Sequence, residues 1–231
     1  MSKSIHDPFS GEEIESVIGK PAKCNATAKY LLLIGAAIIS IIPSALALVG
    51  FLAFRFRLLW WWELRWAWGL HWLDSAPMLL MAVFPCCFAW AYRKNSRWLP
   101  ILGWGVLIFA VIHTLRPFAL GISCSISMPF TLQFVMSRIA EAAFALVYGA
   151  LWFCIALLCL RLQKVIAYRC FLYAALWTIS GIYSTSASFF RFLYSPIIVD
   201  AFAIFIPVYC LLTLCSFVKA HCQTLKRLKQ T

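Results

Sequence analysis

The sequence predicts an all-α, polytopic membrane protein with six transmembrane helices and a Trp-rich interfacial helix between the first two. Composition is the first reason, since 64% of the 231 residues are hydrophobic and only 12% are charged. A water-soluble domain of this size buries only about 70–75% of its surface, which leaves no room for so much apolar side chain. The second reason is that the apolar residues form long runs without charge. The third is that the two-residue period of a membrane β-barrel is absent.

The apolar runs are the basis for the predicted spans, because a helix needs about 20 apolar residues to cross the hydrocarbon core. The first run, from Tyr30 to Phe54, contains no charged residue, and the fourth is interrupted only by Glu141. An A-x-A pattern at 45–47 resembles a signal-peptide cleavage site, but apolar residues continue beyond it, so we interpret the first run as a span. The predicted spans cover residues 30–54, 76–92, 99–117, 139–160, 170–190 and 197–218.

Lys and Arg are divided unequally between the two sides that this topology defines. Fourteen of the 20 lie in the N-terminal tail 1–29, the connections 93–98 and 161–169, and the basic C-terminal tail 219–231. The positive-inside rule therefore predicts that both termini are cytoplasmic, in a plasma or inner membrane. Basic residues beside helix ends attract anionic lipid headgroups. They account for the net charge of +12 without a nucleic-acid partner.

The N-terminal tail contains a local helix signal. Ser10 as N-cap and Glu13 three residues later form a capping box, and Phe9 and Ile14 add a hydrophobic staple. The pattern predicts a short cytoplasmic helix that ends at Gly19.

Residues 55–74 hold six of the eleven Trp residues of the chain. Trp favours the headgroup region, so we expect a helix that lies in the interface on the side opposite the termini. At 100° per residue, one narrow arc of this helix carries Glu63, His71 and Asp74. This arc is interpreted as the wet side of an amphipathic helix. Metal or proton chemistry and an interaction surface are the alternatives.

Charged and titratable residues recur near the ends of spans three to six on that same side. Arg138 with Glu141 and Arg116 with Asp200 are the expected ion pairs, and His113 is the one group that titrates near neutral pH. One interpretation is an outward-facing pocket that binds anions or handles protons. The other is Arg side chains that snorkel to the interface, with structural ion pairs. The candidate pocket consists of His113, Arg116, Arg138, Glu141, Arg191 and Asp200.

Small residues recur at four-residue spacing in the fourth and fifth predicted spans, where they permit close helix packing. A pore lining is the alternative for the serines. The residues are Ala145 and Gly149 in the fourth span, and Ser180, Gly181, Ser184 and Ser188 in the fifth.

No motif assigns a catalytic residue, a metal site or a cofactor. A transmembrane haem would need two facing histidines, and His71 is the only candidate partner for His113. The ten cysteines include no C-x-x-C pair and are expected to be packing residues.

Three functions remain, of which a non-enzymatic role is favoured. In that role the protein acts through membrane lipids, partner helices or a homo-oligomer, in regulation or assembly. The first alternative is a small transporter or binding protein with the outward charged pocket. The second is an outer-face enzyme that acts on a lipid-linked substrate.

Overall fold

The computed structural model describes residues 5–6, 13–14, 19–55, 72–123, 130–160, 163–190 and 194–230, and it describes side chains within most of these ranges. Six helices form nearly all of the described part. They are α1 (Gly19–Arg55), α3 (Trp72–Ala91), α4 (Trp98–Ser123), α5 (Phe130–Leu160), α6 (Lys164–Phe189) and α7 (Pro196–Gln230).

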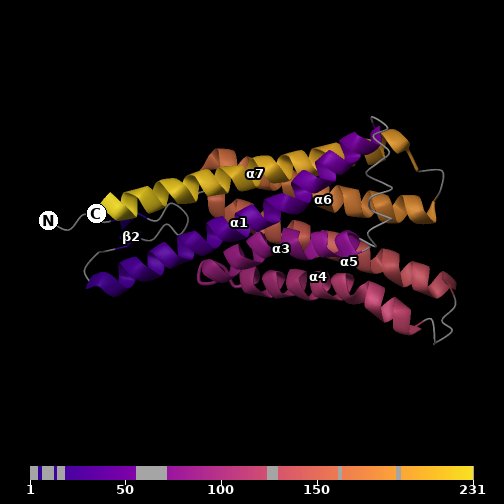
Figure 1. Ribbon diagram of the computed structural model, residues 1–231, viewed down its shortest axis with the longest axis horizontal. Coiled ribbons are helices and arrows are strands. Elements are labelled where there is room, and N and C mark those ends of the chain that lie inside the picture. The colour runs from indigo at the N-terminus through magenta and orange to yellow at the C-terminus, as the bar shows by residue number, and fades with distance from the viewer. Residues whose placement is uncertain are drawn as a thin grey trace.

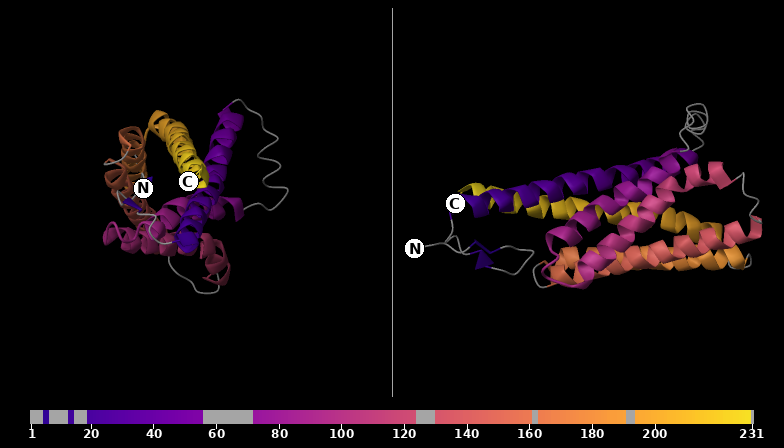
Figure 2. Two further views of the ribbon diagram at one scale, coloured as in Figure 1. Left: turned by 90° about the vertical axis from the view of Figure 1, so that its left-hand side faces the viewer. Right: turned by 90° about the horizontal axis from the view of Figure 1, so that it is seen from below.

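Successive helices run in alternating directions along the long axis of the molecule (Figure 1). The start of α1 and the end of α7 therefore lie at one end, here called the terminal end, as the second view of Figure 2 also shows. The opposite end, called the distal end, carries the connection between α6 and α7. The most extensive helix contacts are those of α5 with α6, α1 with α7, and α3 with α4, and α1 also packs on α3.

Five of the described helices are long and apolar enough to cross a membrane, all except α3. The apolar part of α3, Pro77–Ala91, is shorter. Large apolar side chains on the outside of the bundle are exposed, for example 57% of Leu31 and 59% of Ile101. Such a surface is unfavourable in water and suits a hydrocarbon solvent. The helices are thus consistent with a multi-pass protein embedded in a membrane.

An aromatic core lies where α3, α5, α6 and α7 meet. The rings of Phe84 and Phe217 are 4.9 Å apart, and those of Trp152 and Tyr173 are 5.0 Å apart. All four side chains are at most 1% exposed. A polar contact joins α1 to this core, because Ser40 Oγ accepts a hydrogen bond from the Phe84 N–H at 3.0 Å.

The predicted close packing of small residues is confirmed between α5 and α6. A Cβ on Gly181 would overlap the Cβ of Ala145, and a Cβ on Gly149 would overlap Thr178 Oγ1. The same Cβ on Gly149 would lie 3.2 Å from the Ala174 carbonyl oxygen. The absence of side chains at the two glycines thus sets the distance between the helices.

The prediction of a short N-terminal helix is wrong at the two of its residues that the structure describes. Strand β2 (Glu13–Ile14) pairs antiparallel with β1 (Ile5–His6), so that Ile5 lies opposite Ile14. A helix of about eight residues is marginal alone, and backbone pairing of the two short strands takes its place here. Ser10 lies outside the described residues.

Several helix ends also differ from prediction. Gly19 begins α1 instead of ending a helix, and Pro21 is tolerated there because the first turn has no helical acceptor for its N–H. The basic C-terminal tail is a continuation of α7 to Gln230, and α4 extends beyond 117 to Ser123. Apolar runs locate the lipid-facing part of a helix, whereas its backbone hydrogen bonds continue into polar sequence.

The Trp-rich segment cannot be compared with its prediction in full. Residues 56–71, which include Glu63 and His71, lie outside the described residues. Asp74 belongs to the first turn of α3, and its side chain lies outside the described set.

Candidate functional site

A cavity of about 920 Å³ lies in the distal half of the bundle, between α6 and α7, with contributions from α1, α3 and α5. Ligand pockets in proteins span roughly 300–1,000 Å³, so this cavity is large enough for a small organic molecule. Ser44, at 1% exposure, lies on its buried side, whereas Val199 on its wall is 39% exposed. The cavity is therefore open toward the surroundings of the protein.

One wall consists of polar side chains from α6. Ser180, Ser184 and Ser188 all line the cavity, which agrees with the lining alternative that their spacing allowed. A four-residue spacing keeps side chains on one helix face, while the intervening Gly181 packs on α5. The hydroxyl of Ser188 donates to the Ser184 carbonyl at 2.7 Å. The Ser188 hydroxyl can therefore only accept hydrogen bonds from the cavity.

Trp177 also belongs to this wall. The indole Nε1 is buried and has no hydrogen-bond partner among the described residues. Buried polar atoms are usually hydrogen-bonded, and an indole N–H can only donate. Because Nε1 has no accessible surface, the part of Trp177 that faces the cavity is its apolar ring.

The opposite wall is apolar and belongs to α7. Val199, Phe202 and Ile206 line it together with Ala203 and Pro207. Because a proline has no N–H, Pro207 removes the α-helical donor for the Ala203 carbonyl. A backbone acceptor is thus released beside an otherwise apolar surface.

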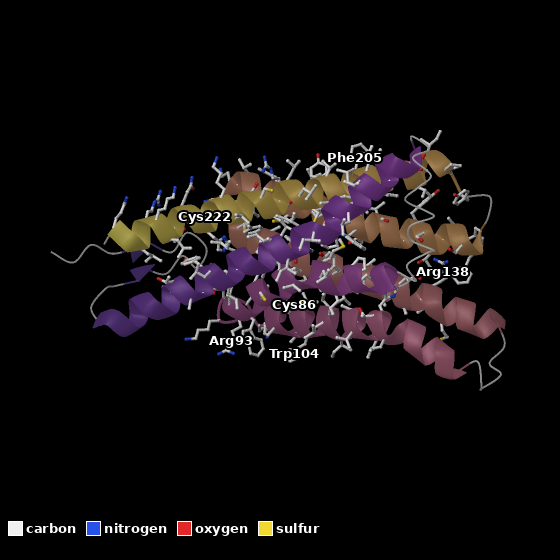
Figure 3. The ribbon with its side chains drawn as sticks, viewed as in Figure 1. Cys86, Arg93, Trp104, Arg138, Phe205 and Cys222 are labelled. Atoms are coloured by element: carbon white, nitrogen blue, oxygen red, sulfur yellow. The ribbon has the colours of Figure 1, made fainter. Side chains whose placement is uncertain are left out.

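Arg138 of α5 is the charged side chain among the described lining residues. Figure 3 shows it in the distal part of the bundle, far from Arg93 near the terminal end. Its Nη1 donates to Glu141 Oε2 at 2.8 Å, which confirms the predicted ion pair. The Arg138 and Glu141 side chains are 32% and 30% exposed, so the pair is partly buried. Glu141 itself is not among the lining residues.

The other predicted pocket residues do not join Arg138 at this cavity, as far as the structure describes them. His113 lies on α4, which packs against α3 and α5 and contributes no described lining residue. Asp200 follows the lining residue Val199 on α7 but does not line the cavity. The side chain of Arg116 and the whole of Arg191 lie outside the described residues. The Arg116–Asp200 ion pair therefore stays a prediction.

The connection between α6 and α7 is tied down beside the cavity by Tyr183. Its hydroxyl accepts a hydrogen bond from the Ser195 N–H at 2.7 Å and lies 3.3 Å from the Ser195 carbonyl oxygen. Its ring centroid lies 5.9 Å from that of Phe202. One side chain therefore links the polar wall, the apolar wall and the connection between them.

Prolines interrupt three of the five helices that line the cavity, at the depth of the cavity itself. Pro43 of α1 precedes the lining residue Ser44, and Pro85 of α3 follows the lining residue Met81 by four positions. Pro207 of α7 is itself a lining residue. Interrupted helices at membrane depth occur where the freed backbone groups face protein or a cavity rather than lipid.

Within the described part of the chain, no group of three or more His, Cys, Asp or Glu side chains is placed to hold a metal ion. The described cysteines, among them Cys159, Cys170 and Cys210 in the core, are free thiols. No protein-family model, curated protein or solved structure matches this chain.

Sequence reasoning missed Trp177, Tyr183 and the apolar wall on α7. A signal existed for the first two, because they share the helix face of the serines at three- and four-residue spacing. No such signal exists for Phe202 and Ile206, since an apolar side chain that faces a cavity resembles one that faces lipid.

Proposed function

We propose that this is a six-span membrane protein whose distal cavity binds a small amphiphilic molecule, as a binding protein or transporter. The observation that carries the proposal is the cavity itself, with an apolar wall on α7 opposite a wall that contains hydroxyl and guanidinium groups. Such a surface is complementary to a molecule with an apolar body and a polar end. This proposal combines the favoured non-enzymatic role, which acts through lipids, with the alternative of a small binding protein.

Helix geometry supports the sixth span. At 1.5 Å per residue, the 20 residues of α3 measure about 30 Å, the usual thickness of the hydrocarbon core. The alternating helix directions require α3 to return the chain from the distal to the terminal end (Figure 1).

Aromatic and basic side chains support a cytoplasmic membrane boundary at the terminal end. The Arg93 guanidinium lies 5.1 Å from the Trp90 ring centroid, and that of Arg97 lies 5.4 Å from the Trp98 ring centroid. Both Trp rings are about half exposed, at 53% and 54%. Trp and Arg favour the headgroup region, and basic residues favour the cytoplasmic side.

The distal end would then face outward, and the proposed Trp-rich interfacial helix between α1 and α3 would lie in the outer headgroup layer. Both α1 and α3, which this segment connects, have their adjoining ends there (Figure 1).

The groups that line the cavity suit binding better than acid–base chemistry. A guanidinium stays protonated at neutral pH, and serine and tyrosine groups act there as hydrogen-bonding partners. We therefore do not propose the outer-face enzyme.

Binding of a fluorescent amphiphile to the purified full-length chain in phosphatidylcholine nanodiscs tests the proposal. The probe is the methyl ester of dansyl-undecanoic acid, whose emission shifts to the blue in apolar surroundings. Ala203→Trp fills the cavity and is expected to weaken saturable binding at least about tenfold, since it removes the ligand's space. Ala175→Trp is the matched control, because Ala175 lies exposed on α6 away from the cavity. Equal binding to both variants would overturn the proposal.

A further inference from the structure

Resting on the proposed function, we infer that the polar end of the ligand is an anion, a carboxylate or phosphate that Arg138 binds in exchange for Glu141. The ligand class is then a single-chain anionic amphiphile. Its head lies at Arg138, Ser180 and Ser184, and its chain lies along α7.

The first argument is charge. Arg138 is the charged residue among the described lining residues, so the cavity surface they form has a formal charge of +1. Glu141 compensates this charge from the side, one helical turn along α5, and does not line the cavity. A cationic head would approach the guanidinium without a lining carboxylate to balance it, whereas an anionic head would form a charge-assisted hydrogen bond.

The second argument is hydrogen-bond polarity. The guanidinium of Arg138 has only donors and cannot accept a hydrogen bond from a ligand. Serine hydroxyls at Ser180 and Ser184 can add donors on the same wall. An ionised carboxylate offers only acceptor oxygens, and a phosphate offers at least two ionised acceptor oxygens at neutral pH, which matches this set.

The third argument is the division of the cavity between its two walls. The apolar side chains of Val199, Phe202 and Ile206 face a ligand over about two turns of α7. An inorganic anion would leave this surface uncovered, and a simple hydrocarbon would leave the donors of α6 unsatisfied. An amphiphile satisfies both.

The contact between Arg138 and Glu141 makes the exchange testable, because the two residues should have opposite effects. Nη1 of Arg138 meets Oε2 of Glu141 at 2.8 Å, so this carboxylate occupies one of the five guanidinium donors and repels a ligand anion beside it. Removing the carboxylate should strengthen anion binding, and removing the guanidinium should weaken it. If the pair served stability alone, both substitutions would act in the same direction.

The experiment compares dansyl-undecanoic acid with its methyl ester on the full-length chain in phosphatidylcholine nanodiscs. We expect the acid to bind about tenfold more tightly than the ester, the effect of one charge-assisted hydrogen bond. Arg138→Gln should abolish this preference and Arg138→Lys should retain part of it. Glu141→Gln should raise the affinity for the acid several-fold and leave that for the ester unchanged. Thermal unfolding of each variant identifies any that fail to fold, and the Lys variant then supplies the comparison.

The outcomes separate this inference from the proposed function. Equal affinities for acid and ester would overturn the anionic head, while cavity binding would stand if Ala203→Trp still weakened it. Displacement of the probe by sodium acetate or inorganic phosphate as effectively as by unlabelled undecanoic acid would overturn the amphiphile. Loss of acid affinity in both Arg138→Gln and Glu141→Gln would overturn the exchange.

Discussion

The hydroxyl of Tyr148 in α5 donates a hydrogen bond to the backbone carbonyl of Met81 in α3, over 3.2 Å. This carbonyl has no α-helical donor, because the residue four positions later is Pro85. Tyr148 also lies 3.4 Å, oxygen to oxygen, from Tyr173 of α6. A tyrosine from one helix thus replaces the hydrogen bond that a proline removes from another, and it does so beside the cavity that Met81 lines.

Replacing Tyr148 by Phe is expected to destabilise the protein by about 0.5–2 kcal/mol, because it leaves the Met81 carbonyl unpaired in an apolar interior. Pro85→Ala restores a backbone donor, so we expect the loss in the double variant to be smaller than in Tyr148→Phe alone. Unfolding by sodium dodecyl sulfate in mixed micelles measures both effects. Tyr168→Phe is the control, since Tyr168 is 60% exposed. Additive effects of the two substitutions would contradict this explanation.

The two glycine environments predict opposite responses to the same substitution. A Cβ on Gly181 would overlap Ala145 of α5, so Gly181→Ala must push α5 and α6 apart, at about 1–3 kcal/mol. A Cβ on Gly35 of α1 would meet nothing within 4 Å. Gly35→Ala should therefore be neutral or stabilise by up to about 1 kcal/mol through helix propensity. The same unfolding measurement applies, and equal losses in both variants would show that the glycines do not set this contact.

Reporter fusions test the proposed topology. Green fluorescent protein fused after Gln230 should fluoresce and alkaline phosphatase at that position should be inactive, because the proposed C-terminus is cytoplasmic. After Ser195, in the distal connection, the two results should be reversed. A fusion after Asn95, between α3 and α4, should behave like the one after Gln230, provided that α3 spans the membrane. An Asn95 fusion that behaves like the Ser195 fusion would reduce the number of spans.

Helix existence and helix pairing were predictable from the sequence for different reasons. Charge-free runs such as 30–54 are long enough to cross a membrane as a helix, which satisfies every backbone hydrogen bond within the segment. Helix α1 covers that run. Ala145 and Gly181 indicated close packing, because small residues allow two helices to approach each other closely. The helix ends were not predictable, because Gly19, a strong local stop signal, is instead the first residue of α1.

The candidate site was predictable in its charged part and, through the lining alternative, in the serines of α6. Arg138 and Glu141 were recognisable because charge is rare near a span and the two residues lie one turn apart. The prediction could not tell which of the other charges share a cavity, since this depends on which helices are neighbours. His113 lies on α4, and the described cavity wall is formed by other helices. Pairing of α6 with α7 is a property of the packed bundle and has no local sequence signal.

The hydrogen bonds between Tyr183 and Ser195 predict a loss of affinity that is independent of ligand charge. Tyr183→Phe removes the hydroxyl that accepts from the Ser195 N–H at 2.7 Å, and it keeps the ring that packs on Phe202. The connection between α6 and α7 then loses its attachment to the cavity wall. Ligand binding must order this part of the cavity, and the cost of that ordering weakens binding. We expect the affinities for dansyl-undecanoic acid and for its methyl ester to fall by a similar factor, about three- to tenfold. Tyr168→Phe should change neither, and a loss confined to the acid would mean that the Tyr183 hydroxyl binds the ligand head instead of holding the connection.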